Sequence, residues 1–280
     1  MPEIQILTRP RAPPVWAAEP PPPAAARAAV SKDMRVFTRG GCPPLGELAG
    51  QVAEVWSGRR WITVRVDEAP GLTEFLRVCL DDGTCLICAE DHPWAVVEDG
   101  GLVPVRAGDL RADHTVSPFF LCPPGDLVGV AVGDAYDQGA TFAGRLSRRR
   151  LFKVELPAHV FTMDCESLGL FVAGWMDAQK GTLCGPLEVI HHLQIAVVRL
   201  GVYHTFVENM GTYSVLTLSE TDGDLVPNPK GLRRQHRRTT TDLPRVTSVC
   251  RIGGRKKAFT ITSDDPRART VVLDGVLTLC

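Results

Sequence analysis

The segment GLFVAGWMDAQKGTL, residues 169–183, contains an acid at a position where it could do chemistry. Its small and apolar residues predict a helix that ends in an acidic turn, with Asp177 near that end. A second carboxylate two positions later would make a site for a hard cation, because Mg²⁺ prefers carboxylate oxygens. That position is occupied by Gln179. The sequence thus has the spacing of a metal site but only one of its two carboxylates. The alternative interpretation is a core helix with Asp177 as a capping residue.

Two other groups have residue types that can bind metal. Cys85 and Cys88 form a CxxC without a second pair at zinc-site spacing, and the apolar run around them favours buried thiols. His191 and His192 have no Cys or carboxylate at ligand spacing. Nine cysteines scattered without a framework favour a reducing compartment over a disulfide scaffold. We therefore expect no bound metal and no cofactor.

Composition describes an ordinary globular protein. The chain has 280 residues, enough for one large domain or two small ones, with 44% hydrophobic and 22% charged residues. A net charge of −1 gives no general attraction to polyanions, so any such binding must come from local patches. The N-terminus has no apolar signal region, and no run approaches the roughly 20 apolar residues that span a bilayer. We expect an intracellular protein without membrane contact, and no small-molecule site is evident.

The chain divides into segments of different texture. Residues 1–29 are rich in Pro and Ala, which predicts polyproline II or disorder. From residue 30, short β-branched runs separated by Gly, Asp and Pro predict a mostly β domain of many short strands. These runs are RVFT (35–38), QVAEVW (51–56), RWITVRV (60–66), FLRVCL (75–80), TCLICA (84–89), WAVVED (94–99) and LVPVRA (102–107).

The segment 151–242 interrupts this β texture. Apolar residues in LEVIHHLQIAVVRLGV (187–202) lie near one helical face and predict a helix closed by Gly201. A hairpin that turns near residues 209–211 follows, and then the basic run KGLRRQHRR (230–238). The β texture resumes over 243–280, so an α+β segment divides the β domain.

Three stretches, residues 34–66, 78–110 and 257–280, together have the motif order of a known family. They include MRVFTRGGCPPLGEL, LDDGTCLICAEDHPW and VVLDGVLTLC, and these resemble the Hint fold of inteins and Hedgehog autoprocessing domains. The closing DGVLTLC resembles inteins of ribonucleotide reductase. Within the interrupting segment, VAGWMDAQK and LQIAVVRLGV resemble a LAGLIDADG (DOD-type) homing endonuclease. The resemblance implies a horseshoe-shaped β Hint domain, 30–150 with 243–280, divided by a LAGLIDADG-like half-domain over 151–242.

The resemblance assigns splicing roles to five positions. Inteins begin with a Cys or Ser that attacks the preceding carbonyl, and this position falls near Ala29. A Thr and a His then polarise the scissile amide, and here they correspond to Ala89 and His92. Release requires an Asn that cyclises, where this chain has Leu279. Cys280 matches the residue that accepts the acyl group, but it is the last residue of the sequence.

For the endonuclease, the resemblance makes the second acid of the motif the Mg²⁺ ligand. That position is Gln179, whereas Asp177 matches the first acid. Mg²⁺ would be expected only if the insert were active. A single motif copy is present, and self-dimerisation could supply the second copy but not the missing ligand.

Three hypotheses follow. The first is a degenerate intein that neither splices proteins nor cuts DNA, with His92, Asp177 and Cys280 as remnants of its sites. The second is a module that kept the folds and binds double-stranded DNA through basic residues, which are Arg148, Arg149, Arg150, Arg233, Arg234, Arg237 and Arg238. The third is partial N-terminal autocleavage, with Ser31 or Cys42 as the nucleophile.

Overall fold

The structure is a computed structural model, and it describes most of the chain. The described residues are 28–99, 101–117, 126–148, 154–202, 205–219, 225–228, 230, 236–237, 243–265 and 270–279. The predicted Pro/Ala-rich leader, 1–29, lies outside them except for its last two residues. Of these, Ala29 already belongs to a strand, so the β domain begins there.

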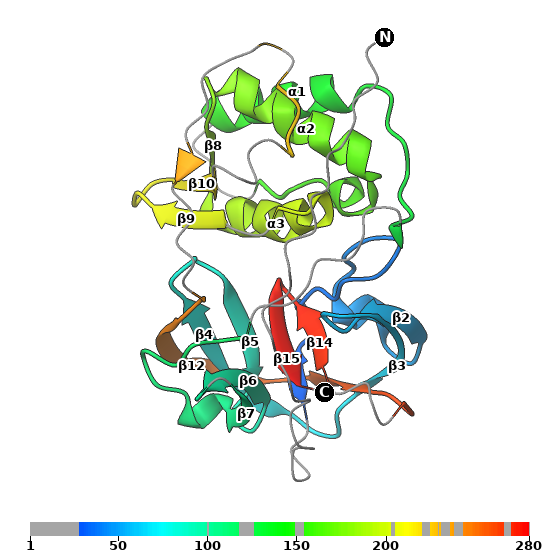
Figure 1. The fold of residues 1–280 in the computed structure, drawn as a ribbon, viewed down its shortest axis with the longest axis vertical. Helices are drawn as coiled ribbons and strands as arrows, with labels where there is room; N and C mark the ends of the chain where they lie inside the picture. The colour runs from blue at the N-terminus through cyan, green and yellow to red at the C-terminus, as the bar shows by residue number, and fades with distance from the viewer. Residues whose placement is uncertain are drawn as a thin grey trace.

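The lower half of the molecule in Figure 1 is built from β-strands, and the upper half contains the helices. Seven antiparallel strands form one sheet in the order β12-β4-β5-β1-β13-β3-β2. Their bounds are β1 Ala29–Ser31, β2 Val52–Trp56, β3 Trp61–Glu68, β4 Thr73–Leu80, β5 Cys85–Ala89, β12 Val246–Lys256 and β13 Ala258–Thr262. A second sheet has the order β14-β15-β6-β7, with β6 Pro93–Glu98, β7 Gly101–Arg106, β14 Thr270–Leu273 and β15 Val276–Leu279.

Alternation of apolar and polar residues explains these strands. In β3, residues 62, 64 and 66 are buried while 63 and 65 are exposed, as expected for a strand with one face on the core. Six of the seven predicted runs are strands in the structure. The exception is RVFT, residues 35–38, which makes only isolated bridges because its partners lie on three different segments. The 3-10 turns η1 Leu45–Leu48 and η2 Ala107–Asp109 connect the strands.

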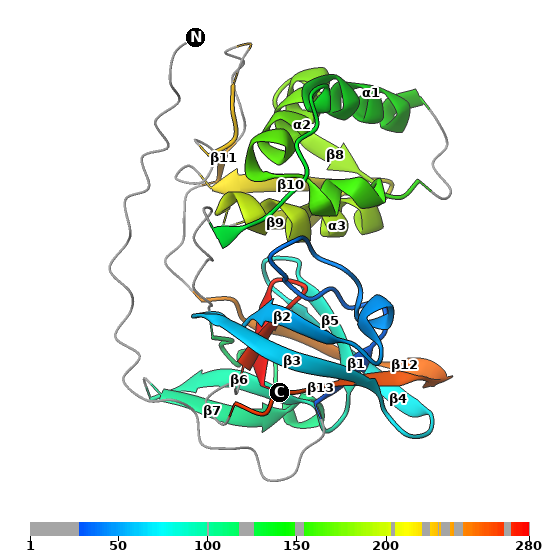
Figure 2. The same cartoon turned by 90° about the vertical axis from the view of Figure 1, so that its right-hand side faces the viewer.

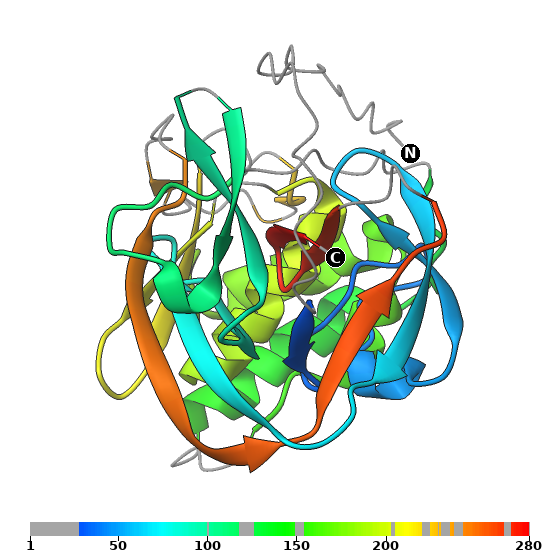
Figure 3. The same cartoon turned by 90° about the horizontal axis from the view of Figure 1, so that it is seen from below.

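The C-terminal hairpin β14–β15 lies inside the curved ribbon of the larger sheet, as Figure 3 shows from below. Its turn consists of Asp274 (φ 47°) and Gly275 (φ 78°), the two left-handed residues that a type I′ hairpin turn requires. Asp274 Oδ1 accepts a hydrogen bond from the Arg35 backbone N–H at 2.7 Å. The hairpin is thereby held against the chain that follows β1.

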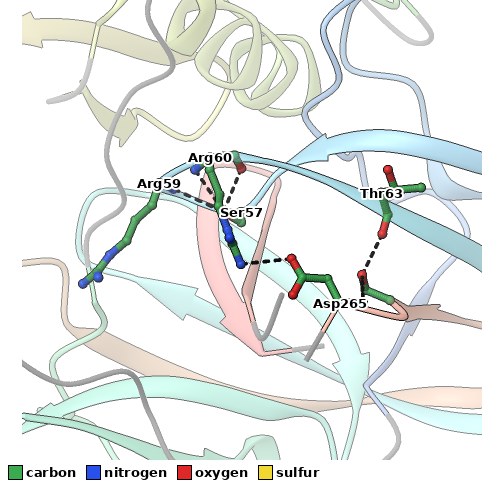
Figure 4. A network of polar contacts seen from close by, with 6 residues as sticks. Ser57, Arg59, Arg60, Thr63 and Asp265 are labelled. Carbon is green, nitrogen blue, oxygen red and sulfur yellow. Dashed lines mark hydrogen bonds and ion pairs between the residues drawn. The ribbon is translucent and has the colours of Figure 1, made fainter. Parts of the chain in front are cut away.

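The turn between β2 and β3 is held by polar contacts shown in Figure 4. Ser57 Oγ donates to the carbonyl of Arg60 at 2.8 Å, and the Arg60 guanidinium pairs with Asp265 at 3.1 Å. Ser263 Oγ donates to the carbonyl of Thr63 at 2.7 Å. These contacts bind the end of β13 to the β2–β3 hairpin.

The upper half is an α+β layer with a small sheet of its own. Its helices are α1 Ala135–Arg148, α2 Cys165–Ala178 and α3 Leu187–Val197, with 3-10 turns η4 Ala158–Thr162 and η5 Val198–Leu200. Its strands are β8 Leu183–Gly185, β9 Thr205–Asn209, β10 Ser214–Ser219 and β11 His236–Arg237. The predicted helix, its end at Gly201 (φ 83°) and the predicted hairpin are all confirmed. None of the described helices combines the length and apolarity needed to cross a bilayer.

Helices α1 and α2 pack with their backbones in contact (Figure 2). A Cβ at Gly174 of α2 would lie 2.0 Å from the carbonyl oxygen of Tyr136, and one at Gly139 of α1 would lie 1.9 Å from that of Phe171. Only glycine fits at both positions. Helix α2 begins with Asp164, whose side chain accepts from the Ser167 N–H, and it is buried on nearly all sides.

The chain leaves and re-enters the β half at neighbouring points. The Val116 N–H donates to the carbonyl of Pro244 at 2.8 Å, and Thr115 bridges Arg245. Helix α1, which follows the departure, packs on α2 in the upper half. The domain boundaries at 151 and 243 stay predictions.

Candidate functional site

Strand β1 brings Ala29 and Ala89 together. Val30 lies opposite Phe259 of β13 on one side and opposite Cys88 of β5 on the other. Successive pairs of an antiparallel ladder keep their register, so Ala29 lies beside Ala89. Both methyl groups belong to one small buried cluster with Ala69, Phe75 and Ala258. Two positions that are 60 residues apart in sequence thus share one environment.

His92 lies at the turn between β5 and β6. Its backbone N–H donates to the carbonyl of Ala89 at 3.1 Å, and its own carbonyl accepts from Ala107 at 2.8 Å. The side chain is 1% exposed, and neither ring nitrogen has a hydrogen-bond partner among the described residues. Burial lowers the pKa of the imidazole from 6.5 to about 3. The ring is therefore neutral at physiological pH and keeps one donor and one acceptor unused.

The C-terminal strand approaches the same turn. In β15, Thr278 lies opposite Trp94, two residues after His92, and the two strands are antiparallel. The chain therefore advances toward His92 as it nears its last residues. Leu279 is fully buried, and Cys280 lies outside the described residues. The starts of β1 and β6 and the end of β15 define one corner of the β half, which we call the junction corner.

The described residues at the junction corner offer an imidazole but no nucleophile. Ala29 and Ala89 have only methyl groups, and Leu279 has no carboxamide. The nearest thiol, Cys88, belongs to the main β core on the opposite face of β5 from Ala89. Burial raises its pKa to about 12, so it is a neutral thiol. Acyl transfer needs a hydroxyl or thiol at the reacting position, and Ala29, Ala89 and Leu279 have neither.

The two alternative nucleophiles lie in different surroundings. Ser31 is 5% exposed, and its hydroxyl donates to Asp33 Oδ2 over 3.5 Å. Cys42 is fully buried in the seam between the two halves, where burial raises the pKa of its thiol to about 11 despite the nearby Arg199 and Arg35. Both groups are buried, and the Cys42 thiol is neutral, so neither has the exposed surroundings of a reactive nucleophile.

Gln179 has a structural role at the end of α2. Its Oε1 accepts hydrogen bonds from the Trp175 indole at 2.9 Å and from the Cys184 backbone N–H at 2.6 Å. Its Nε2 donates to the carbonyl of Cys184 at 3.0 Å. The amide thus ties α2 to β8, and both of its polar atoms are engaged. A carboxylate could accept two of these bonds but could not donate the third.

Asp177 is also held inside the layer. Its Oδ2 accepts from the Tyr136 hydroxyl at 2.7 Å, and its Oδ1 is buried without a partner among the described residues. The helix cap is Asp164, so the expectation of a capping role for Asp177 was wrong. Tyr136 comes from α1, which covers the Gly174 surface. The Gly174 face of α2 is therefore covered by α1 within this chain.

The predicted DNA contacts fall mainly on residues outside the described chain. Arg149, Arg150, Arg233, Arg234 and Arg238 lie there, Arg148 ends α1, and Arg237 lies in β11. Strand β11 pairs with β10 in parallel, with Ser219 opposite Arg237. Strands β8, β9 and β10 contain no Lys or Arg, so cationic contacts from this sheet would have to come from the run 230–238.

The cysteines contradict one expectation. Cys79 and Cys85 lie opposite each other on β4 and β5 and form a disulfide, although the cysteine pattern favoured free thiols. Cys88 is buried as expected. The sequence spacing alone does not show that these two cysteines pair, because only the register of the β4–β5 hairpin places them opposite each other. Within the described residues, no group of three or more His, Cys, Asp or Glu side chains could hold a metal ion.

One feature near the junction corner was missed from the sequence. A pocket of about 570 Å³ opens beside Ala89 and is lined by Asp91 of the β5–β6 turn, Asp109 of η2 and residues at the start of β4 and in β12. Its walls come from four separate segments, so no local pattern could have shown it. The only sequence signal is the concentration of charged residues at the ends of these strands.

No family model and no curated protein matches the chain. Among solved structures, it is similar to a mutant of an Ssp DnaB mini-intein variant, with a TM-score of 0.40 and 11% identity over 90% of this chain and 98% of that one. The same mini-intein variant without the mutation gives a TM-score of 0.40 and 10% identity over 90% of this chain and 92% of that one. The PabCDC21-1 intein gives a TM-score of 0.29 and 19% identity over 32% of this chain and 72% of that one. The similar proteins are inteins, and these TM-scores are below 0.5.

Proposed function

We propose that this chain is a degenerate intein, a Hint-type β domain that carries a LAGLIDADG-derived helical layer and neither splices proteins nor cuts DNA. The observation that carries the proposal is the junction corner. Ala29, Ala89, His92 and Leu279 were assigned to successive steps of splicing on sequence motifs alone. These positions come from strands far apart in the sequence and meet at one corner.

The corner has the layout that splicing needs but lacks the reacting groups. The amide before Ala29 would lie near position 89, where a hydroxyl could hold it, and near an imidazole that could protonate the leaving nitrogen. His92 remains with two unpartnered ring nitrogens among the described residues. Ala29 cannot carry an acyl group, Ala89 cannot donate a hydrogen bond, and Leu279 cannot cyclise. In this proposal each step lacks the group that performs it.

The insert supports the same interpretation. Gln179 stands where the motif would have its metal-binding acid, and its amide instead holds α2 to β8. Gly174, the small residue through which motif helices approach, packs on Tyr136 of α1. The helix is thus retained for packing in this proposal, without metal chemistry.

Fusing the chain between two reporter proteins tests the loss of splicing, and a ligated reporter product would overturn it. A restoration experiment tests the assignment of the corner itself. We expect Ala29→Cys combined with Ala89→Thr to release the upstream reporter on incubation with a strong thiol, because a thioester could then form at residue 29. Ala258→Cys with Ala89→Thr is the matched control, since Ala258 shares the cluster but not the junction. Equal release, or none from either variant, would contradict the assignment.

Retention on DNA is a second proposal, and the observation that favours it is the pairing of β11 with β10, which places His236 and Arg237 of the basic run 230–238 on the sheet of the upper half. Salt-dependent retention of the chain on double-stranded DNA would support this function. It should disappear when Arg233, Arg234, Arg237 and Arg238 are replaced by Gln. Absence of retention at low salt would exclude it.

A further inference from the structure

The turn between β4 and β5, residues 81–84, contacts the upper half of the molecule. The carbonyl of Asp82 accepts hydrogen bonds from Gln194 Nε2 of α3 at 3.2 Å and from the Val207 backbone N–H of β9 at 3.1 Å. A Cβ at Gly83 would lie 2.6 Å from the Val207 Cβ, so glycine is needed for this close approach to β9. The turn is therefore docked on one helix and one strand of the upper half.

The same turn also contacts the segment through which the chain re-enters the β half. The Asp81 N–H donates to the carbonyl of Arg245 at 2.9 Å, and Asp81 Oδ1 accepts from the Arg245 N–H at 3.0 Å. One short turn thus bonds to α3, β9 and the re-entry segment. Its conformation therefore determines how the upper half is held at this point.

A disulfide closes this turn at its base. Cys79, next to last in β4, and Cys85, first in β5, lie opposite each other and are bonded. Such a bond restricts the conformations of the short loop that it closes. Both cysteines are half-buried, whereas Cys42 and Cys88 are buried. A dissolved thiol can therefore reach this bond, and accessible disulfides are more readily reduced than buried ones.

We propose that the Cys79–Cys85 disulfide is a redox switch, opened by a dithiol, that sets how firmly the β4–β5 turn is docked on α3 and β9. A thiolate of the dithiol attacks one sulfur, the S–S bond breaks, and the other cysteine leaves and takes up a proton. The second thiol of the reagent then displaces the first cysteine. The dithiol becomes a disulfide, and the two cysteines receive its two electrons and two protons.

Reduction leaves the turn to its own backbone hydrogen bonds. These run from the Leu80 N–H to the carbonyl of Thr84 at 2.8 Å and from the Gly83 N–H to the carbonyl of Leu80 at 3.1 Å. The reduced loop has more conformations to lose on docking, so the contacts of Asp82 open more often. The inference rests on contacts of the described residues and does not depend on the proposed intein ancestry.

Native-state hydrogen exchange measured by NMR tests the switch. The Val207 amide reports the docked turn, because its N–H donates to the carbonyl of Asp82. We expect it to exchange about tenfold faster in protein reduced with dithiothreitol than in the oxidised protein. The Val128 amide is the internal control, since its N–H donates to the carbonyl of Arg39 at 2.9 Å and that bond includes no residue of the turn. Its exchange rate should stay unchanged.

The variant Cys79→Ala/Cys85→Ala is the matched control. Its Val207 amide should exchange as fast as that of the reduced protein, with or without dithiothreitol. Equal Val207 exchange in oxidised and reduced protein would overturn the proposal. Equal acceleration of Val207 and Val128 would also overturn it, because that result indicates a general loss of stability, and so would a response of the variant to dithiothreitol. The experiment measures neither splicing nor DNA binding, so its failure leaves the proposed function to its own tests.

Discussion

Two buried groups give the protein's stability opposite pH dependences. Burial raises the pKa of Asp274 from 3.8 to about 7, although the hydrogen bond from Arg35 and its nearby charge act the other way. Burial lowers the pKa of His92 from 6.5 to about 3. Each side chain is therefore neutral inside the folded protein over a range in which it is charged in the unfolded chain.

The sign of each contribution follows from proton binding. Between pH 3.8 and about 7, the folded protein holds a proton on Asp274 that the unfolded chain has lost, so stability falls as the pH rises. Between pH 6.5 and about 3, the unfolded chain binds a proton at His92 that the folded protein does not, so stability falls as the pH is lowered. The two windows overlap over most of their width.

Between pH 7 and pH 5 the two contributions nearly cancel. One pKa unit corresponds to about 1.4 kcal/mol. On going from pH 7 to pH 5, His92 therefore lowers the free energy of unfolding by about 2 kcal/mol, and Asp274 raises it by about 2 kcal/mol. Replacing either residue removes one side of this balance. His92→Gln should make the protein about 2 kcal/mol more stable at pH 5 relative to pH 7 than the wild type. Asp274→Asn should shift the same difference by about 2 kcal/mol in the opposite direction.

Urea unfolding at pH 5 and pH 7, compared among the wild type and both variants, measures these differences. Asn can accept the Arg35 hydrogen bond and tolerates the left-handed turn at position 274, so Asp274→Asn isolates the charge. Asp82, whose pKa burial raises to about 6, and the histidines of α3 contribute equally to all three proteins and drop out of the comparison. Parallel pH dependences in all three proteins would refute the reasoning.

Three further predictions concern packing and thiols. Gly174→Ala should lower the free energy of unfolding by about 3 kcal/mol, because its Cβ would meet the Tyr136 carbonyl at 2.0 Å. The control Gly144→Ala should be neutral or stabilising, because a Cβ there meets nothing within 4 Å. Equal effects of the two changes in urea unfolding would contradict the tight α1–α2 contact. Removing the disulfide by Cys79→Ala/Cys85→Ala should cost about 2 kcal/mol, the entropy of a short closed loop, and an unchanged urea midpoint would argue against it. Cys42 should stay unmodified by a thiol reagent that labels exposed Cys250 within minutes, and mass spectrometry that finds both labelled at equal rates would contradict its burial.

Strand prediction succeeded where alternation was strong and failed where tertiary packing decides. The runs in β3 and β4 alternate clearly, and both are strands. Strand β1 begins in an alanine-rich segment with little β propensity, and it forms because β5 and β13 pair with it on both sides. Helix α1 was not predicted, although Phe142, Ala143 and Leu146 form a buried apolar stripe on it that packs on α2 together with the glycine contacts.

The site was only partly predictable for a similar reason. Motif resemblance proposed the positions of Ala29, Ala89 and His92, but only the register of β1 and β5 brings the first two together. The amide at position 179 was visible in the sequence. The hydrogen bonds that it makes were not, because they depend on where β8 crosses the end of α2.

His92 is the residue that distinguishes a packing role from an inherited one. A buried polar group without a partner costs on the order of 1–3 kcal/mol, and a histidine kept for packing alone would be expected to bond at least one ring nitrogen. Here both nitrogens are unpaired among the described residues, beside a position that holds alanine. In the proposed function, the missing partners of this imidazole are the reacting amide and a hydroxyl at position 89. Ala89→Thr should therefore raise the free energy of unfolding in urea by about 1 kcal/mol where its hydroxyl bonds a His92 ring nitrogen, whereas the proposed chemistry at residue 29 also requires Ala29→Cys.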